Sequence, residues 1–148
     1  MALVLEEHTN LSRREIHDIV MEKLSWVNLD KFAGFYPSEI SGGMKKRAGL
    51  ARALALEPAL LFFDEPSAGL DPLASANLDK LILDIKAKTN STIVIVSHEL
   101  DSIFSTADRI IMLDKQRKTI VADGDPRDLK DNSADQWVKT FLNRNNTR

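Results

Sequence analysis

Two adjacent carboxylates at the end of a short apolar run are the first candidate catalytic residues of this sequence. Asp64 and Glu65 follow the apolar residues 60–63 directly and precede Pro66. Neighbouring strand residues point to opposite sides, so the two side chains should have different tasks. One could hold a hydrated Mg²⁺ ion, and the other could orient a water molecule for attack. Pro66 is expected to restrict Glu65 to an extended backbone.

An imidazole follows a second apolar run, TIVIV at residues 92–96, where the chain continues with Ser97 and His98. The helix expected between the two runs would make them parallel strands joined by a right-handed crossover. The carboxyl ends of such strands share one edge of the sheet, where open α/β sheets bind ligands. We therefore expect His98 to converge with Asp64 and Glu65; the alternative is a polar loop after a core strand.

A glycine-containing segment, SGGMKKR at residues 41–47, is a second candidate for phosphate chemistry. Gly42 and Gly43 permit close approach of a backbone, and the free N–H groups of a helix N-terminus attract anions. Three basic residues then oppose the helix dipole, each at a cost of roughly 0.3–1 kcal/mol: Lys45, Lys46 and Arg47. Positive potential for phosphate would explain this cost; a capped helix with solvated lysines is the alternative, which the segment alone favours.

Several helices have clear start signals. A Ser-x-x-Glu spacing opens an amphipathic segment at residues 12–27. Ser41 is the expected N-cap of a helix that runs from about Gly43 until Pro58 forbids its continuation. Asp71, which stands before a proline, is expected to cap the helix between the two apolar runs.

The remaining chain predicts a hairpin and two helices. The segments RIIML and TIVAD read as strands joined by a polar turn at residues 114–118. A short helix should begin at Asp125, and a last helix should carry Trp137. This order of elements predicts an α/β chain whose mostly parallel sheet is covered by helices on both faces.

The composition indicates a soluble globular protein. Of the 148 residues, 43% are hydrophobic and 28% are charged, which argues against disorder. The net charge of -2 gives no basic field for nucleic acid. Without cysteine, disulfides and thiolate metal sites are excluded. No apolar stretch suits a bilayer and no secretory leader is evident, so a membrane role would need a partner.

Together these segments resemble the ATP-binding-cassette (ABC) transporter ATPases over nearly the whole chain. ISGGM at residues 40–44 resembles the signature motif of that family, and LLFFDE at residues 60–65 resembles its Walker B strand. SAGLD at residues 67–71 resembles the D-loop, and His98 the switch histidine. Met44 stands where the family commonly has glutamine. This SGGM variant, with the basic residues after it, resembles the signature segment of the Mla-type ATPases of lipid transporters associated with MCE proteins.

The resemblance implies a P-loop NTPase-type fold and a role for each candidate residue. Asp64 is expected to hold Mg²⁺, Glu65 to act as the catalytic carboxylate, and His98 to support the γ-phosphate of ATP and the attacking water. Two subunits of the family dimerise head to tail, so the signature of one closes on the ATP of the other. The expected ATP-binding residues are therefore Ser41, Gly42, Gly43, Met44 and Asp71, the last of which would also couple the two sites.

Two motifs of the family have no counterpart in the sequence. There is no G-x-x-x-x-G-K-[S/T] phosphate loop, and the only glutamines, Gln116 and Gln136, lie after the Walker B strand, so no Q-loop precedes it. We therefore expect a truncated nucleotide-binding domain that is inactive alone. Its parts within residues 1–148 would be a helical and signature region at about 11–57, a Walker B to switch-histidine core at 58–122, and C-terminal helices at 123–148.

The resemblance also implies partners and a location. The complete subunit would hydrolyse ATP to power a transmembrane permease for lipids or other hydrophobic compounds, with an MCE-type substrate-binding protein as a further partner. It would be cytoplasmic and peripheral on the inner face of the cytoplasmic membrane. Nucleic acid is not an expected partner, and strands left without neighbours should make the chain self-associate.

Two other functional classes remain open. The absent phosphate loop suits a non-catalytic half-domain that acts as an interaction module, whereas the set of Asp64, Glu65 and His98 suits a working ATPase. A DNA-repair or chromosome-organising ATPase shares the signature and Walker B features. It would also show long heptad repeats or a basic surface near the signature, and the sequence has neither.

Overall fold

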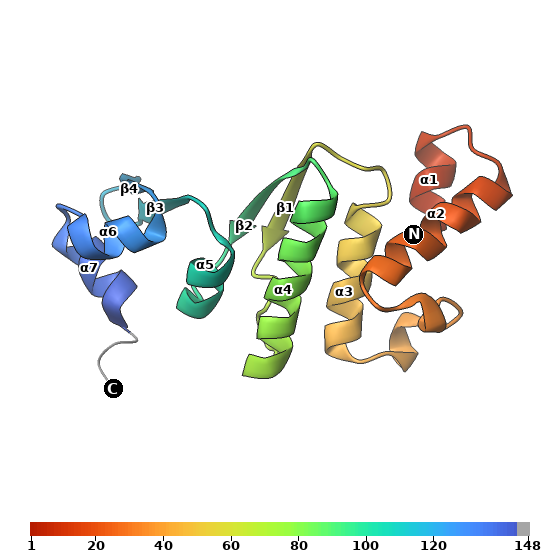
Figure 1. Cartoon of the computed structure of the whole chain (residues 1–148), viewed down its shortest axis with the longest axis horizontal. Coiled ribbons are helices and arrows are strands. Elements are labelled where there is room, and N and C mark those ends of the chain that lie inside the picture. The colour runs from red at the N-terminus through yellow and green to blue at the C-terminus, as the bar shows by residue number, and fades with distance from the viewer. Residues whose placement is uncertain (145–148) are drawn as a thin grey trace. The chain divides into compact units, whose positions relative to one another are not determined.

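The computed structural model describes residues 1–144 of the chain, which divides into two units, Met1–Val96 and Ser97–Arg148 (Figure 1). The elements of unit 1 are α1 (Ala2–His8), α2 (Arg13–Trp26), the 3-10 helices η1 (Asp30–Phe32) and η2 (Pro37–Glu39), α3 (Gly42–Ala53), β1 (Leu60–Asp64), α4 (Pro72–Lys88) and β2 (Thr92–Val96). Those of unit 2 are α5 (Leu100–Thr106), β3 (Ile110–Asp114), β4 (Thr119–Gly124), α6 (Pro126–Asn132) and α7 (Gln136–Asn143).

The helix starts follow the local signals of the sequence. At α2 the predicted capping box is confirmed, since the Glu15 N–H donates to Ser12 Oγ at 3.3 Å and the Ser12 N–H donates to Glu15 Oε2 at 2.7 Å. Helix α3 ends at Ala53, well before Pro58, and the chain then turns through Glu57, whose φ is 48°. Helix α1 was not predicted, and its Leu5 packs in a small core of unit 1.

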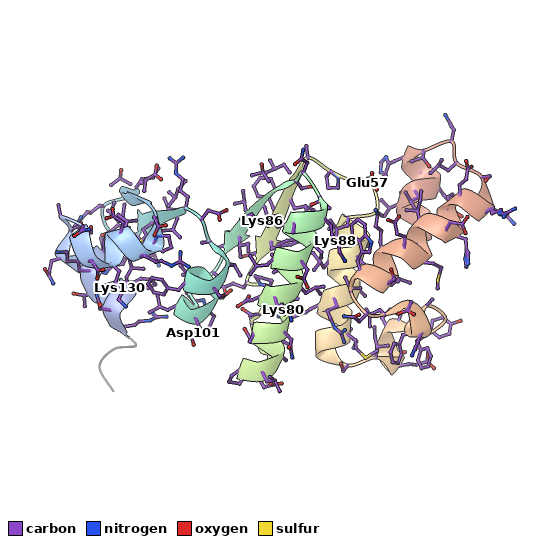
Figure 2. All side chains as sticks on the ribbon, viewed as in Figure 1. Glu57, Lys80, Lys86, Lys88, Asp101 and Lys130 are labelled. Atoms are coloured by element: carbon purple, nitrogen blue, oxygen red, sulfur yellow. The ribbon has the colours of Figure 1, made fainter. Side chains whose placement is uncertain are left out.

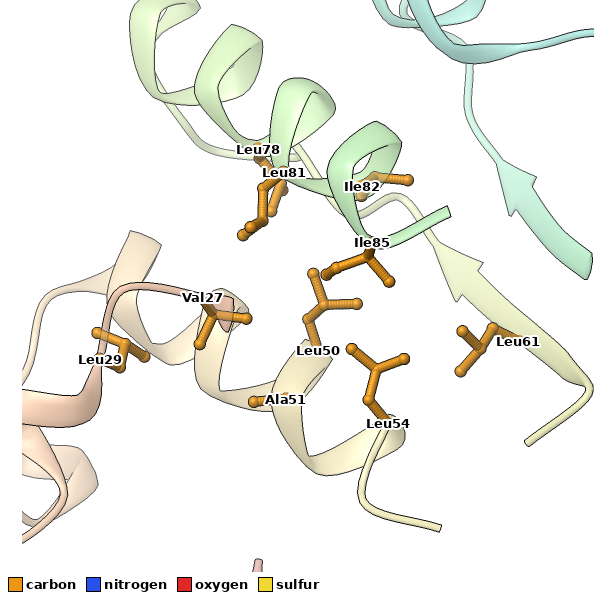
Figure 3. Close-up of a cluster of buried hydrophobic side chains, with 10 residues drawn as sticks. All are labelled: Val27, Leu29, Leu50, Ala51, Leu54, Leu61, Leu78, Leu81, Ile82 and Ile85. Carbon is orange, nitrogen blue, oxygen red and sulfur yellow. The ribbon is translucent and has the colours of Figure 1, made fainter. Parts of the chain in front are cut away.

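The two apolar runs form a parallel pair, as predicted. Leu61 lies beside Ile93 and Phe63 beside Ile95 in the register of β1 and β2, with α4 as the crossover helix. These residues face a core that α3 and α4 complete (Figure 3). Its buried members are Val27, Leu29, Leu50, Ala51, Leu54, Leu61, Leu78, Leu81, Ile82 and Ile85.

Within unit 1, the predicted helix cover on both faces of this pair is found on one face only. Side chains alternate along a strand, so the residues between the core-facing ones point the other way. On that second face Phe62 is 70% exposed and Val96 is 58% exposed, and Leu60 and Val94 are exposed as well. Helices α3 and α4 therefore cover one face of the two strands. The continuous apolar runs in the sequence did not indicate which face this would be.

Unit 2 contains the predicted hairpin and its helices. Strands β3 and β4 are antiparallel, with an irregularity between Met112 and Leu113. Asp114 closes the turn, because its Oδ1 accepts from the N–H groups of Gln116 at 2.6 Å and Arg117 at 3.0 Å. The core of this unit consists of Leu100, Met112, Ala122, Val138 and Leu142. Within residues 1–144, no helix has the length and apolar character needed to cross a membrane.

A buried lysine connects α2 to the loop that leads into β1. Lys23 is 0% exposed, and its Nζ donates to Glu57 Oε1 at 2.7 Å and lies 3.9 Å from the ring centroid of Trp26. Glu57, labelled in Figure 2, belongs to the loop between α3 and β1. The hydrogen bond from Lys23, and then its charge, lower the pKa of Glu57. This pair holds the entry to the strand that carries the two carboxylates.

We predict that Glu57→Gln lowers the free energy of unfolding by about 1 kcal/mol at neutral pH. A hydrogen bond between charged groups contributes about 1.5–3 kcal/mol, and this value is reduced because water screens a carboxylate that is 74% exposed. Since folding lowers the pKa of Glu57, the contribution is present above the ordinary value of 4.5 and is lost as the pH falls below it.

Urea unfolding of the wild type and the variant at about pH 7 and about pH 3 measures this effect. The difference in stability should shrink at the lower pH, and Glu7→Gln, on exposed α1 surface, should have no effect at either. A difference of the same size at both pH values would rule out the Glu57 carboxylate as its source.

Candidate functional site

The end of β1 positions the two carboxylates. Asp64 lies beside Val96 in the parallel register, and the Glu65 N–H donates to the Val96 carbonyl at 2.9 Å, which extends the pairing by one residue. Asp64 is exposed and Glu65 is partly buried. The two carboxylates thus leave the sheet at the shared carboxyl edge of both strands, in different environments.

The prediction of an extended backbone at Glu65 is wrong. Its φ is 45°, in the left-handed region that few residues other than glycine adopt. Two hydrogen bonds impose this geometry: the N–H of Glu65 reaches Val96, and its carbonyl accepts from the Ala68 N–H at 3.1 Å, so the chain must turn here. Backbone strain of this kind persists where the surroundings impose it, and it is frequent at active sites.

The start of α3 is capped as predicted, but two of its three cations serve the protein itself. Lys46 Nζ donates to the carbonyl of Pro66 at 2.8 Å and also to that of Ala68. The Arg47 guanidinium donates to the Val27 carbonyl at 2.9 Å. Only Lys45 of the three is exposed. Lys46 and Arg47 are thus not solvated side chains, and their internal roles had no sequence signal.

The signature segment lies at the open end of α3. Ser41 Oγ accepts from the Met44 N–H at 3.2 Å. A hydroxyl group that accepts can still donate its own hydrogen. Ser41 and Gly42 are exposed, whereas Gly43 and Met44 are partly buried. A helix N-terminus of this kind can present N–H groups and a hydroxyl to an anion.

Asp71 and His98 are placed differently. Asp71 caps α4, since its Oδ1 accepts from the Ala74 N–H at 2.9 Å and Pro72 follows as predicted. His98 stands two residues beyond Val96, in unit 2, with its Nε2 3.6 Å from Glu99 Oε1. The Arg144 guanidinium donates to the His98 carbonyl at 2.6 Å. The convergence of His98 with the two carboxylates stays a prediction.

The donor set suits a metal ion that is shared with a ligand. The described residues contain no group of three or more histidine, aspartate or glutamate side chains that could hold a metal. Mg²⁺ in proteins usually takes one or two carboxylates and fills the remaining positions with water and substrate phosphate oxygens. The exposed Asp64 carboxylate fits this chemistry, and Mg²⁺ binding by Asp64 stays a prediction.

A cavity of about 350 Å³ adjoins the carboxylates. Its polar lining comes from α3 and the end of β1, namely Lys46, Arg52, Asp64 and Glu65, and its apolar lining includes Leu78 and Ile82 of α4. A larger open hollow of about 570 Å³, on the β3–β4 hairpin, borders none of the candidate residues. The smaller cavity is therefore the candidate functional site, because the candidate residues line it.

We predict that Asp71→Ala lowers the free energy of unfolding by about 1 kcal/mol, because the first turn of α4 loses its cap. Asp71→Asn should retain most of the stability, since asparagine caps helices as well as aspartate. Urea unfolding of both variants provides the test. If the alanine variant is as stable as the wild type, the carboxylate does not stabilise α4.

Comparisons with known proteins agree with this geometry. The family model described as ABC transporter matches residues 3–68. The Mycobacterium tuberculosis relative "Probable ribonucleotide transport ATP-binding protein mkl" is 47% identical over 142 residues, which are 96% of this chain and 39% of that protein. The Escherichia coli relative "Intermembrane phospholipid transport system ATP-binding protein MlaF" is 45% identical over 143 residues, 96% of this chain and 52% of that protein.

A solved structure of an ABC transporter in an inward-facing conformation has the same fold. It superposes with a TM-score of 0.80 at 24% identity, covering 97% of this chain and 56% of that one. The chain spans about half of the length, or less, of the curated relatives named above. The family model and the relatives show that this chain is similar to the ATP-binding proteins of ABC transporters, and the solved structure shows that it shares their α/β fold.

Proposed function

We propose that this chain supplies the signature helix, the Walker B strand and the switch histidine of an ATP-hydrolysing subunit of an ABC transporter. The position of Asp64 and Glu65 at the shared carboxyl edge of β1 and β2 carries this proposal. Asp64 holds Mg²⁺, Glu65 polarises the attacking water, and His98 supports the γ-phosphate. Catalysis by these groups is positioning and charge stabilisation, as phosphoryl transfer requires.

The phosphates of the nucleotide are held, in this proposal, by a phosphate loop outside the printed sequence. The support is the absence of a G-x-x-x-x-G-K-[S/T] segment among the 148 residues. In a head-to-tail dimer the segment from Ser41 to Met44 contacts the ATP of the second subunit, and Asp71 couples the two sites. The chain alone is then inactive.

A lipid or another hydrophobic compound is the proposed cargo of the transporter. The support is the similarity to MlaF, which is named for phospholipid transport, together with Met44 in the signature segment. The subunit would work on a permease at the inner face of the cytoplasmic membrane, with an MCE-type protein as a further partner. The weak net charge of -2 gives no support for nucleic acid binding.

A second candidate function, a non-catalytic interaction module, draws support from the exposed apolar face of β1 and β2. Phe62 and Val96 are largely exposed there. Exposed apolar surface and open strand edges favour contact with another polypeptide. We propose that the isolated chain self-associates through such surfaces, and this behaviour is compatible with either function.

The test of the proposed function is a chimaera in which this chain replaces the matching residues of E. coli MlaF. It should hydrolyse ATP, and Glu65→Gln should reduce steady-state hydrolysis by about 10²-fold or more, because a general base commonly contributes 10²–10⁴-fold. ATP binding should survive, since the substitution keeps the shape of the side chain. Glu6→Gln, on exposed surface of α1, is the matched control.

Two results would count against the proposal. Near-normal hydrolysis by the Glu65→Gln chimaera would remove Glu65 from the catalytic role. A folded wild-type chimaera without any ATP hydrolysis would favour the interaction module.

A further inference from the structure

The loop that follows the two carboxylates approaches the signature helix at two places. The first is Lys46, in the second turn of α3, whose Nζ donates to the carbonyls of Pro66, at 2.8 Å, and Ala68. An ammonium group has three hydrogens to donate and these two acceptors are backbone carbonyls. Hydrogen bonds from a charged donor are stronger than neutral ones, so Lys46 is a firm link between α3 and this loop.

The second place is the first turn of α3. A Cβ atom added at Gly43 would lie 3.8 Å from Leu70 Cδ2, which is ordinary van der Waals contact. Leu70 and Met44 both pack against the core cluster that includes Leu50 and Leu78. The Leu70 side chain therefore lies close to Gly43, in addition to the hydrogen bonds that Lys46 makes with the loop.

The loop is otherwise held at its two ends. Glu65 is fixed by its hydrogen bond to Val96, and Asp71 by its cap on α4. Between them the Leu70 N–H donates to the Ser67 carbonyl at 3.0 Å, and Gly69 has a φ of 75°, which glycine adopts at no steric cost. Without Lys46, the middle of the loop would depend on these local turns and on the Leu70 contact.

We propose that Lys46 is a positioning residue, which makes residues 65–71 move together with the signature helix. The contact between Lys46 and the loop is given by the hydrogen bonds of the structure. Its importance for turnover rests on the proposed function. When the start of α3 meets a phosphate group, the link carries any displacement of the helix to the loop between Glu65 and Asp71. In this role Lys46 acts through Glu65 and Asp71.

Hydrogen exchange tests the contact in the chain itself. Lys46→Met removes the donors and keeps the apolar stem, so the amides of Ala68 and Leu70 should exchange about tenfold faster or more. Lys46→Arg should restore the wild-type rates, and the amides within β1 should keep theirs. The matched control is Lys80→Met, an exposed lysine of α4 labelled in Figure 2, which should change nothing. Equal exchange in the wild type and Lys46→Met would overturn the proposal.

A measurement on the wild type decides the question if Lys46→Met does not fold. Under limited acetylation, Lys46 should react about fivefold more slowly than Lys80, because its ammonium is held by two carbonyls. Equal reactivity of the two lysines would overturn the proposal.

The chimaera with E. coli MlaF separates positioning from a merely structural role. Lys46→Met should lower kcat about tenfold with an unchanged KM for ATP, and Lys46→Arg should restore it. Faster exchange with an unaltered kcat would overturn the positioning role and leave the proposed function intact. An inactive wild-type chimaera would overturn the proposed function and the positioning role with it, while hydrogen exchange would still decide the contact.

Discussion

The parallel pairing of β1 with β2 is the constraint on which the rest of the site depends. It brings Asp64 beside Val96, and the Glu65 N–H then uses the last carbonyl of β2 at 2.9 Å. One hydrogen bond beyond the regular register thus fixes the point at which the chain must turn. The φ of 45° at Glu65 and the loop that follows are consequences of this turn.

The core beneath the strands explains why this pairing is held in place. Leu61 packs with Leu50 of α3 and Ile85 of α4, so the strand and both helices share one buried cluster. Removal of such side chains from water contributes about 1.5–3 kcal/mol each. The helix that presents the signature segment and the strand that presents the carboxylates are therefore parts of one packed unit. Lys46 adds a polar link between α3 and the loop that follows β1.

Most of the features that the sequence predicted correctly are local ones. Ser12, Ser41 and Asp71 cap helices because each side chain accepts from the N–H group three residues further along the chain. The parallel strands and the hairpin followed from apolar runs and a polar turn. The ABC resemblance rested on short contiguous motifs, and the relatives confirm it.

The features that the sequence did not predict depend on contacts between distant segments. Pro66 indicated that the backbone of Glu65 is restricted. The conformation that Glu65 adopts, however, is set by its hydrogen bond to Val96, which lies far along the chain. Lys46 looked like a solvated or phosphate-facing cation, and it binds carbonyls about twenty residues away instead. The exposed strand face that carries Phe62 was not predicted either, because an apolar run does not indicate which face of a strand a helix will cover.

The central claim is that Asp64 and Glu65 serve a nucleotide whose phosphates are held by a different polypeptide segment. Calorimetric titration of MgATP into this chain and into the chimaera with E. coli MlaF tests it most directly. A phosphate loop supplies several hydrogen bonds to charged groups, each worth about 1.5–3 kcal/mol. We predict a Kd of about 1 μM for the chimaera and about 1 mM or weaker for the chain alone. Micromolar binding with measurable hydrolysis by the chain alone would contradict it.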